Sequence, residues 1–428
     1  MELKFKLQAS ALNAAIEVVS IVPPKAITQE GGSGYLFVIR KDDDGSGKDR
    51  CYVYSQDSYR VARADFEVSD VEGEGAFIYP SQHINSFKFA EGEIAFTVTA
   101  NEEDQVYMVK YDLGSGAGGE RVSFSPKLMG TCDDKLREAE GDQEFPVAIL
   151  TEALSMSKPF LAKPQDSRAE EHFKTIQIFD ETTATQSGKG EGDGTMYASN
   201  SIQGFWFQCD AFKGHPLAVH GQHLPQFASF LAKSEGALTV KSGANMMFAV
   251  DGRGRVFGWV HHASTYKKYS YYARSFDKYI LGVPKMQVTN QLKYMKTELS
   301  AKRDKIRVTF DHKGKTLRFG VVDGDSKAMS MPIDTRVTKT EEADVNANAN
   351  IDHFLELFEG TKADEVELRI ATIPVSDTRP KASVMYRTID EFWLDNEGKV
   401  VGGSGVPEGK EPEGAYKCQV TRFVPGKD

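Results

Sequence analysis

The sequence predicts an α+β protein made of three tandem copies of one unit. The main observation is an aliphatic residue followed three positions later by phenylalanine, which occurs three times: Ile84/Phe87, Leu224/Phe227 and Ile351/Phe354. Successive pairs are 140 and 127 residues apart, which fits a small domain and is too long for a solenoid repeat. Each pair also lies between short predicted strands, so the copies share an element order as well as a marker.

Composition and length agree with a globular protein of two or three domains. The chain has 428 residues, of which 40% are hydrophobic and 27% charged. No apolar run approaches the roughly 18 residues of a membrane span, and the first residues lack a continuous apolar signal core. Cys51, Cys132, Cys209 and Cys418 form no CxxC pair, which is typical of reduced thiols. We therefore expect a cytoplasmic protein, in a bacterium or in a host cell.

The elements of the first unit follow from its apolar spacing and its turn residues. A strand at residues 5–7 precedes a helical pattern of Leu12, Ile16 and Val19, which two prolines end. Around the short marker helix, strands are predicted at residues 35–40, 51–54, 60–66, 77–79, 94–99 and 105–111. A glycine-rich loop at 114–119 follows.

The second and third units repeat this order. In the second unit, Leu150 and Leu154 begin a helix, and strands are predicted at 175–179, 195–199, 204–209, 217–219, 237–240, 246–250 and 256–260. In the third unit, a helix at 288–303 precedes strands at 305–310, 316–321, 327–333, 365–370, 384–386, 391–394 and 417–424. These limits divide the chain into domains at 1–140, 141–284 and 285–428.

Positive charge is concentrated in residues 266–307. This segment contains eleven lysines and arginines and three acidic residues, a net charge of +8 in a chain whose formal net charge is −10. Val288, Leu292, Met295 and Leu299 recur at the spacing of one helix face, so the cations occupy another face. Most such runs are solvated surface, but a localised basic segment in an acidic chain also indicates an anionic partner.

The order strand, helix, three strands, strand, helix, three strands resembles the β sliding clamps of bacterial-type replication machinery. The resemblance covers nearly the whole chain and includes GAFIYPSQHINSFKFAEGEIAFTV at 75–98 and HPLAVHGQHLPQFASFLAKSEGALTV at 215–240. It implies DNA-clamp-like domains with antiparallel sheets outside and two helices inside, and a ring formed by two chains head to tail. Such a ring encircles duplex DNA without reading its sequence and tethers a replicative DNA polymerase. A separate clamp-loader ATPase would place it on DNA, because the sequence contains no P-loop.

The resemblance, together with the basic segment, assigns a set of cations to the DNA-facing side. They are Lys25, Lys88, Lys158, Lys163, Lys233, Lys267, Lys268, Arg274, Lys293, Lys296, Lys302 and Arg303. The last helix departs from this pattern, because it carries Asp352, Glu356 and Glu359. Its lining is therefore expected to be acidic and to limit contact with DNA.

The resemblance further implies a pocket, between the second and third units, for a short peptide of the polymerase or the loader. The matching residues are Ser199, Ile202, Gln203, Tyr279, Ile280, Leu281, Val424 and Pro425. The alternative is that Ile280 and Leu281 are ordinary linker packing. The end RFVPGKD lacks the family's methionine, which favours a different peptide motif and, with the charged loop inserts, a virus-encoded member.

No enzymatic site, metal site or cofactor is predicted. The histidines around His220 have no paired cysteine or carboxylate at ligand spacing. Ser155 and Lys158 have the Ser-x-x-Lys spacing of some acyl-transfer enzymes, without a companion motif. Two alternatives stay open: a β-rich structural or assembly protein without DNA binding, and a hydrolase that uses Ser155 and Lys158.

Overall fold

The computed structural model describes residues 2–426 except 27–31, 42–44, 46, 102–105, 115, 180–193, 201, 215, 262–277, 300–303, 322–328, 374–382, 404–405 and 408. Its contacts divide the chain into two compact units. Unit 1 contains Met1–Val147 and His223–His262, and unit 2 contains Ala148–Gln222 and Ala263–Asp428. Among the described residues, no helix is both long enough and apolar enough to cross a membrane.

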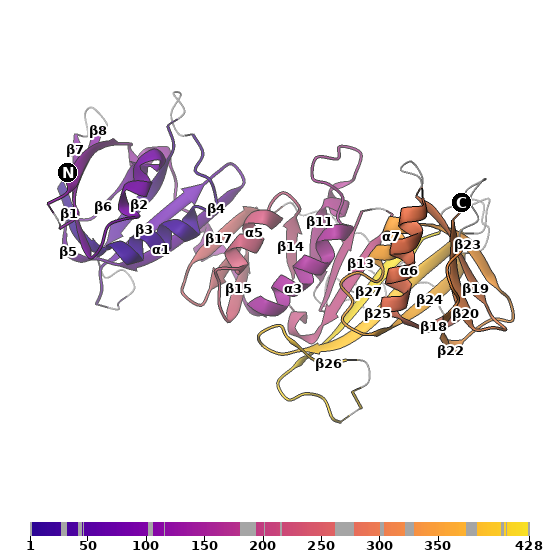
Figure 1. The fold of residues 1–428 in the computed structure, drawn as a ribbon. Coiled ribbons are helices and arrows are strands. Elements are labelled where there is room, and N and C mark those ends of the chain that lie inside the picture. Colours follow the sequence, from indigo (N-terminus) through magenta and orange to yellow (C-terminus); the bar gives the residue numbers. More distant parts are fainter. Residues whose placement is uncertain are drawn as a thin grey trace. The chain divides into compact units, whose positions relative to one another are not determined.

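The first repeat lies in unit 1 and has the predicted elements in the predicted order, with two additional strands, β5 and β9 (Figure 1). Its elements are β1 (Glu2–Gln8), α1 (Ala9–Val19), β2 (Gly34–Arg40), β3 (Arg50–Gln56), β4 (Arg60–Glu67), β5 (Ser69–Glu72), β6 (Gly75–Pro80), the 3₁₀ helix η1 (Ser81–Phe87), β7 (Glu93–Asn101), β8 (Val106–Asp112) and β9 (Gly118–Ser123). A linker with η2 (Pro126–Leu128) and α2 (Asp133–Glu138) follows.

The second repeat is shared between the two units. Its elements are β10 (Glu140–Pro146), α3 (Val147–Ser157), η3 (Lys158–Phe160), η4 (Glu171–Lys174), β11 (Thr175–Phe179), β12 (Thr195–Ser199), β13 (Gly204–Cys209), η5 (Asp210–Phe212), β14 (Leu217–His220), α5 (Leu224–Leu231), β15 (Ala237–Ser242), β16 (Met246–Asp251) and β17 (Val256–Val260). β10, α5 and β15 to β17 belong to unit 1, whereas β11 to β14 belong to unit 2.

The third repeat lies in unit 2. Its elements are β18 (Tyr279–Pro284), α6 (Lys285–Glu298), β19 (Lys305–Asp311), β20 (Thr316–Val321), β21 (Ile333–Asp334), β22 (Arg336–Lys339), β23 (Val345–Asn350), α7 (Ile351–Glu356), β24 (Glu365–Ile373), β25 (Ser383–Leu394), β26 (Val400–Gly403) and β27 (Tyr416–Pro425). Apart from the additional β22 and β26, this is again strand, helix, three strands, twice.

Each unit contains one short and one long antiparallel sheet. Unit 1 has a five-stranded sheet, β5-β1-β7-β8-β9, and an eight-stranded sheet, β10-β15-β16-β17-β4-β3-β2-β6. Unit 2 has a four-stranded sheet, β21-β20-β19-β23, and a longer sheet in the order β14-β11-β12-β13-β27-β25-β24-β18-β22, with β26 on β25. Both long sheets join half of one repeat to half of the next. In each, the last strand of one repeat pairs with the fourth strand of the preceding repeat, β17 with β4 and β27 with β13.

The marker phenylalanines are core residues in all three repeats. Phe87, Phe227 and Phe354 are at most 1% exposed. Each packs against an aromatic side chain of a strand in the same unit: Phe87 on Tyr111, Phe227 on Trp259 and Phe354 on Tyr386, with ring centroids 4.9 to 5.1 Å apart. The repeated marker therefore fixes the second helix of each repeat against its sheet.

Helices pack on one face of the eight-stranded sheet, and the linker between the first two repeats packs on the other. α1 contacts β3 and β4, and α5 packs through Phe227 and Phe230 on Phe257 of β17, all on one face. The opposite face carries a smaller core that includes Tyr54, and the linker residues Met129 and Cys132 pack on it. The linker between the first two repeats is therefore a structural cover for the sheet.

Several predicted limits are wrong. The helix expected at 288–303 spans Lys285–Glu298, because Leu299 turns into extended backbone and packs against the core. The strands expected at 384–386 and 391–394 are the single strand β25, because Met385 to Leu394 pair continuously with β27. Part of the expected loop at 114–119 belongs to β9, which pairs with β8 from Gly118 onward. Strand pairing overrides the local turn signal there.

Candidate nucleic-acid interface and partner surface

α6 is an amphipathic helix, as its sequence predicts. Val288, Leu292 and Met295 are fully buried in the core of the third repeat. Lys293 and Lys296 are exposed on the other side. The further predicted cations of this region, Lys267, Lys268, Arg274, Lys302 and Arg303, lie outside the described residues.

The two exposed lysines of α6 differ in their electrostatic surroundings. Lys296 forms an ion pair with Asp352 of α7, with Nζ and Oδ1 2.6 Å apart. The hydrogen bond to Asp352, followed by the charges of Asp352, Glu359 and Glu356, raises the pKa of Lys296. Lys293 forms no ion pair within the described part of the chain. The acidic α7 therefore neutralises one cation of this helix and leaves the other available.

The predicted cations of unit 1 show the same division. Lys233, which follows α5, is in contact with Glu17 of α1, and this hydrogen bond lowers the pKa of Glu17. Lys25 and Lys88 are exposed and pair with no described carboxylate. In unit 2, Lys158 and Lys163 are likewise exposed without an ion pair among the described residues.

Many of these lysines stand at the C-terminal ends of helices. Lys88 is the C-cap of η1, Lys158 follows α3 directly, and Lys296 lies in the last turn of α6. A cation at this position interacts favourably with the partial negative charge of the helix end. Part of the pattern therefore stabilises the fold, whatever the lysines bind.

The described residues of the turn between β12 and β13 are joined by hydrogen bonds and expose one apolar side chain. The Oδ1 of Asn200 accepts the N–H of Ile202 at 3.1 Å and of Gln203 at 2.7 Å. The Oγ of Ser199 donates to the carbonyl of Gln203 at 2.7 Å. Gln203 is buried and its side chain contacts Glu356, whereas Ile202 is 49% exposed. The turn lies beside the end of β27, since Gly204 pairs with Phe423, so Pro425 is close to it.

The structure separates β18 from this surface. Val424, Tyr386, Ile370 and Tyr279 form one row across β27, β25, β24 and β18, so β18 is three strand spacings away, about 14 Å. Tyr279, Leu281 and Val424 are at most 2% exposed and belong to the core. Ile280 is half-buried on the opposite face. Of the predicted pocket residues, Ile202 and Pro425 are the accessible ones near the turn.

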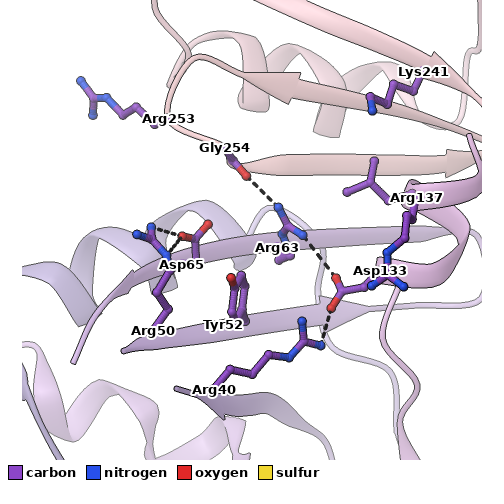
Figure 2. Close-up of a pocket in the computed structure, with 11 residues that line it drawn as sticks. Arg40, Arg50, Tyr52, Arg63, Asp65, Asp133, Arg137, Lys241, Arg253 and Gly254 are labelled. Carbon is purple, nitrogen blue, oxygen red and sulfur yellow. Dashed lines mark hydrogen bonds and ion pairs between the residues drawn. The ribbon is translucent and has the colours of Figure 1, made fainter. Parts of the chain in front are cut away.

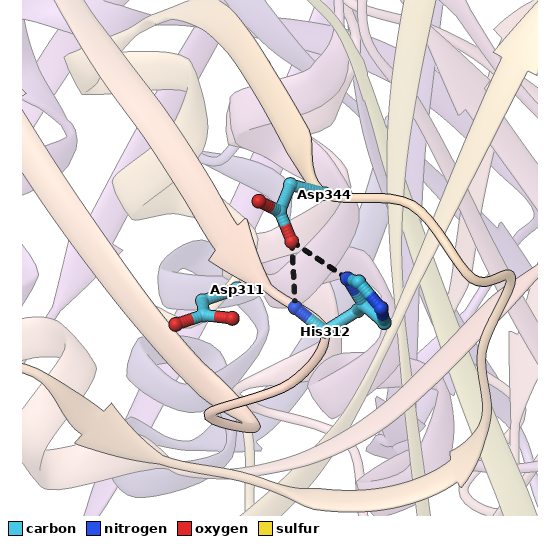
Figure 3. Close-up of side chains that lie close together, drawn as sticks. All are labelled: Asp311, His312 and Asp344. Atoms are coloured by element: carbon cyan, nitrogen blue, oxygen red, sulfur yellow. Dashed lines mark hydrogen bonds and ion pairs between the residues drawn. The ribbon is translucent and has the colours of Figure 1, made fainter.

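Two groups of side chains were missed by the sequence analysis. Asp311, His312 and Asp344 offer potential metal-ligand atoms within 4.8 Å of one another (Figure 3). The Nδ1 of His312 lies 2.8 Å from Asp344 Oδ1, and Asp311 Oδ1 accepts the N–H groups of Lys313 and Gly314. The histidine–aspartate contact and the turn account for this cluster.

The second missed group lies at two sheet ends. In the described chain, β9 ends the five-stranded sheet and β21 ends the four-stranded sheet. Val122 of β9 is 60% exposed, and Met329 and Met331, which precede β21, are 56% and 76% exposed. The sequence alone does not reveal that these apolar side chains are exposed, because an apolar residue in a short strand is normally buried.

No protein-family model matches the sequence, and no curated protein sequence is similar to it. Solved structures match its fold over the full length. The DNA polymerase sliding clamp of Pseudomonas aeruginosa matches with a TM-score of 0.66 and 13% identity over 100% of both chains. The DNA polymerase III beta subunit of Thermotoga maritima matches with a TM-score of 0.61 and 11% identity over 100% of this chain and 99% of that one. A putative DNA polymerase III beta subunit of Eubacterium rectale matches with a TM-score of 0.66 and 11% identity over 99% of both chains.

The protein is thus an α+β protein of three repeats whose sheets continue from one repeat into the next. Its fold, more specifically, is that of the bacterial β sliding clamps, as the repeated element order indicated.

Proposed function

We propose that this protein is a DNA sliding clamp without enzymatic activity of its own. Two chains form a ring around duplex DNA, and the ring tethers a replicative DNA polymerase. The full-length fold match supports this function. The observation that carries it furthest is the way in which the repeats are joined.

Consecutive repeats within the chain are joined by one type of strand pair. The last strand of a repeat pairs with the fourth strand of the preceding one, as β17 does with β4 and β27 with β13. The same rule leaves β9, the last strand of the first repeat, and β21, the fourth strand of the third repeat, without such partners among the described strands. Pairing of β9 with β21 of a second chain satisfies both, and a head-to-tail pairing of this kind closes into a ring.

The side chains at these two strand ends support the pairing. Val122 on β9 and Met329 and Met331 before β21 expose apolar surface that an interface would cover. Leu128, just after β9, is also 48% exposed. Apolar side chains at the centre of an interface are the usual source of dimer affinity.

The exposed lysines that form no ion pair among the described residues supply the contact with DNA. In unit 1 they are Lys25 and Lys88, and in unit 2 they are Lys158, Lys163 and Lys293. Long cationic side chains attract phosphates without reading bases, which sliding requires. Lys233 and Lys296 contribute less, because each already has a carboxylate partner. We retain Lys267, Lys268, Arg274, Lys302 and Arg303 as predicted contacts.

A short peptide of the polymerase or of the clamp loader binds near the turn between β12 and β13. Ile202 and Pro425 are its apolar contacts, and Ser199, Gln203 and Ile280 flank them. Tyr279, Leu281 and Val424 support this surface from the core. Ile202→Asp is a direct probe of this part of the proposal.

The experiment is electron microscopy of the purified full chain, combined with sedimentation and duplex binding at several salt concentrations. We expect a closed annulus with about twice the chain mass of 47.4 kDa and a duplex affinity that falls steeply with salt. A stable monomer at micromolar concentration that does not bind duplex at about 50 mM salt would contradict the proposal.

The two alternatives give different results in the same experiments. A β-rich assembly protein would form particles that show no salt-sensitive binding to duplex DNA. A hydrolase would show turnover that Ser155→Ala removes. Ser155 and Lys158 are both exposed, and no hydrogen bond joins them in the described chain, so this pair does not have the contact that would activate Ser155 as a nucleophile.

A further inference from the structure

Unit 1 contains a cationic cavity on the face of its eight-stranded sheet that lies opposite α1 and α5. The cavity has a volume of about 420 Å³. Its lining residues come from β2, β3, β4, β15, the turn before β17 and the linker helix α2 (Figure 2): Arg40, Arg50, Tyr52, Arg63, Asp65, Asp133, Leu136, Arg137, Lys241, Arg253 and Gly254. The sheet separates this cavity from the helices, so it is distinct from the helix-borne DNA contacts of the same unit.

The lining has a large excess of positive charge. Six lysines and arginines face two carboxylates, a net charge of +4 in a chain of −10. Lys241 is half-buried and has no ion-pair partner among the described residues. An anion that enters this cavity therefore meets three arginines, Arg40, Arg50 and Arg63, that are largely shielded from water, where electrostatic interactions are strengthened.

The two carboxylates hold three of the five lining arginines in position. Asp133 accepts hydrogen bonds from Arg40 at 2.8 Å, Arg63 at 3.3 Å and the Tyr54 hydroxyl at 2.6 Å. Arg63 also donates to the carbonyl of Gly254 at 3.1 Å, and Arg50 Nε donates to Asp65 at 2.8 Å (Figure 2). The entropy cost of ordering these guanidinium groups when a ligand binds is consequently small.

Two of the arginines form cation–π contacts with the ring of Tyr52. The guanidinium carbons of Arg40 and Arg63 lie 5.1 and 5.6 Å from its centroid. Arg63 Nε is buried without a hydrogen-bond partner among the described residues. Because the tyrosine is only 9% exposed, the cavity offers guanidinium groups and no open aromatic face for stacking.

We propose that this cavity is a binding site for a polyphosphate chain, either as an inorganic polyphosphate or as the phosphates of a nucleotide. Guanidinium forks match the geometry of phosphate oxygens. A triphosphate carries about four negative charges in one compact group, which balances the lining. An acidic peptide is a poorer match, because side chains on one side of an extended segment are about 7 Å apart.

The test is calorimetric titration of the full chain at about 50 mM salt with inorganic tripolyphosphate, ATP and a hexaglutamate peptide. We expect one saturable polyphosphate site per chain and no hexaglutamate binding. Equal affinities for tripolyphosphate and ATP would indicate recognition of the phosphates alone, and tighter ATP binding would indicate an additional contact with the nucleoside. Both support the site. Binding of hexaglutamate without binding of tripolyphosphate would overturn it.

Two double variants locate the binding. Arg40→Gln with Lys241→Gln should weaken tripolyphosphate binding about tenfold or more per removed cation. Arg137→Gln with Arg253→Gln changes side chains that are 74% and 60% exposed, so it tests the same site without risk to the core. The matched control is Lys6→Gln with Lys110→Gln, which removes the same charge from exposed positions on the five-stranded sheet.

The control should bind like the unchanged protein, and duplex binding should change equally little in all three variants. Equal weakening in the control would show a general charge effect instead of a site. A selective loss of duplex binding in the two cavity variants would place the cavity in the DNA interface and would also overturn the proposal.

Discussion

Cys209 and Cys418 lie opposite each other on β13 and β27, with their sulfur atoms 3.4 Å apart. Both side chains are at most 1% exposed, and Cys51 and Cys132 are also buried. Burial raises the pKa of Cys132 to about 12 and raises the pKa of Cys51. The hydrogen bond to Cys209 and burial also raise the pKa of Cys418. All four thiols are therefore shielded, and these three remain protonated at neutral pH.

We predict that the folded protein does not react with thiol reagents at pH 8. A thiolate is the reactive species, and its fraction is very small when the pKa lies well above the pH. The measurement is a count of thiols with a chromogenic disulfide reagent, with and without denaturant. Four thiols should react after unfolding and none within the same time before it. Fast reaction of one thiol in the folded protein would contradict the described burial.

Arg422 shows why charge counted in the sequence is not the same as charge available to DNA. Its side chain is 2% exposed, and its guanidinium carbon lies 5.9 Å from the ring centroid of Phe205. Desolvation lowers its pKa to about 10, so it remains charged near neutral pH. A cation in this position strengthens no contact with phosphates, because phosphates do not reach it.

At the scale of elements, the acidic side chains of α7 oppose the cations of α6 in the proposed contact with DNA. Asp352 lies within ion-pair distance of Lys296, and Gln203 fixes Glu356 nearby. The acidic character of α7 was predictable from its sequence. Its effect on one lysine and not on the other follows from the packing of the two helices.

We predict opposite effects of two single changes in these helices. Lys293→Glu should weaken duplex binding about tenfold, because it replaces an available cation with an anion. Asp352→Asn should strengthen binding several-fold, because Lys296 then keeps no charged partner at that position. Fluorescence anisotropy with a labelled duplex measures both effects.

Glu397→Gln is the matched control for Asp352→Asn. It removes one negative charge from a side chain that is 72% exposed in the turn between β25 and β26, away from α6 and α7. Strengthening by Glu397→Gln as large as by Asp352→Asn would show that only net charge matters. Unchanged binding in Lys293→Glu would remove α6 from the DNA interface.

At the scale of the whole molecule, the joining of repeats is the feature with the widest consequences. Each long sheet uses half of two repeats, so a contact-based division of the chain cuts through the second repeat. The predicted domain limits at 140 and 284 mark where one sequence repeat ends and the next begins. The contact-based units do not test them, so they stay predictions. The same joining rule leaves β9 and β21 as the strands available for a second chain.

We predict that Val122→Arg converts the proposed dimer into a monomer at micromolar concentration. A charge at the centre of the proposed pairing should raise the dimer Kd about 100-fold. Sedimentation velocity measures the change, and circular dichroism checks that the chain remains folded. Val400→Arg is the control, since Val400 is 46% exposed on β26, outside the proposed interface. Dissociation by both variants, or by neither, would contradict the assigned edge.

The sequence by itself determined the order of the elements and the threefold repeat. Helical and strand periodicities are local, and the marker phenylalanines reach their buried positions in all three copies because each local pattern has one apolar side. It also determined the buried stripe of α6, since residues at that spacing share one helix face.

Only the tertiary structure decided which charges are available and where the anion-binding cavity lies. Lys233 meets Glu17, and Arg63 meets Asp133 and Gly254, across separations of 216, 70 and 191 residues. No local pattern encodes such partners, because they depend on which strands become neighbours in a sheet. The unpaired ends at β9 and β21 have the same origin, since an edge exists only after all other strands have paired.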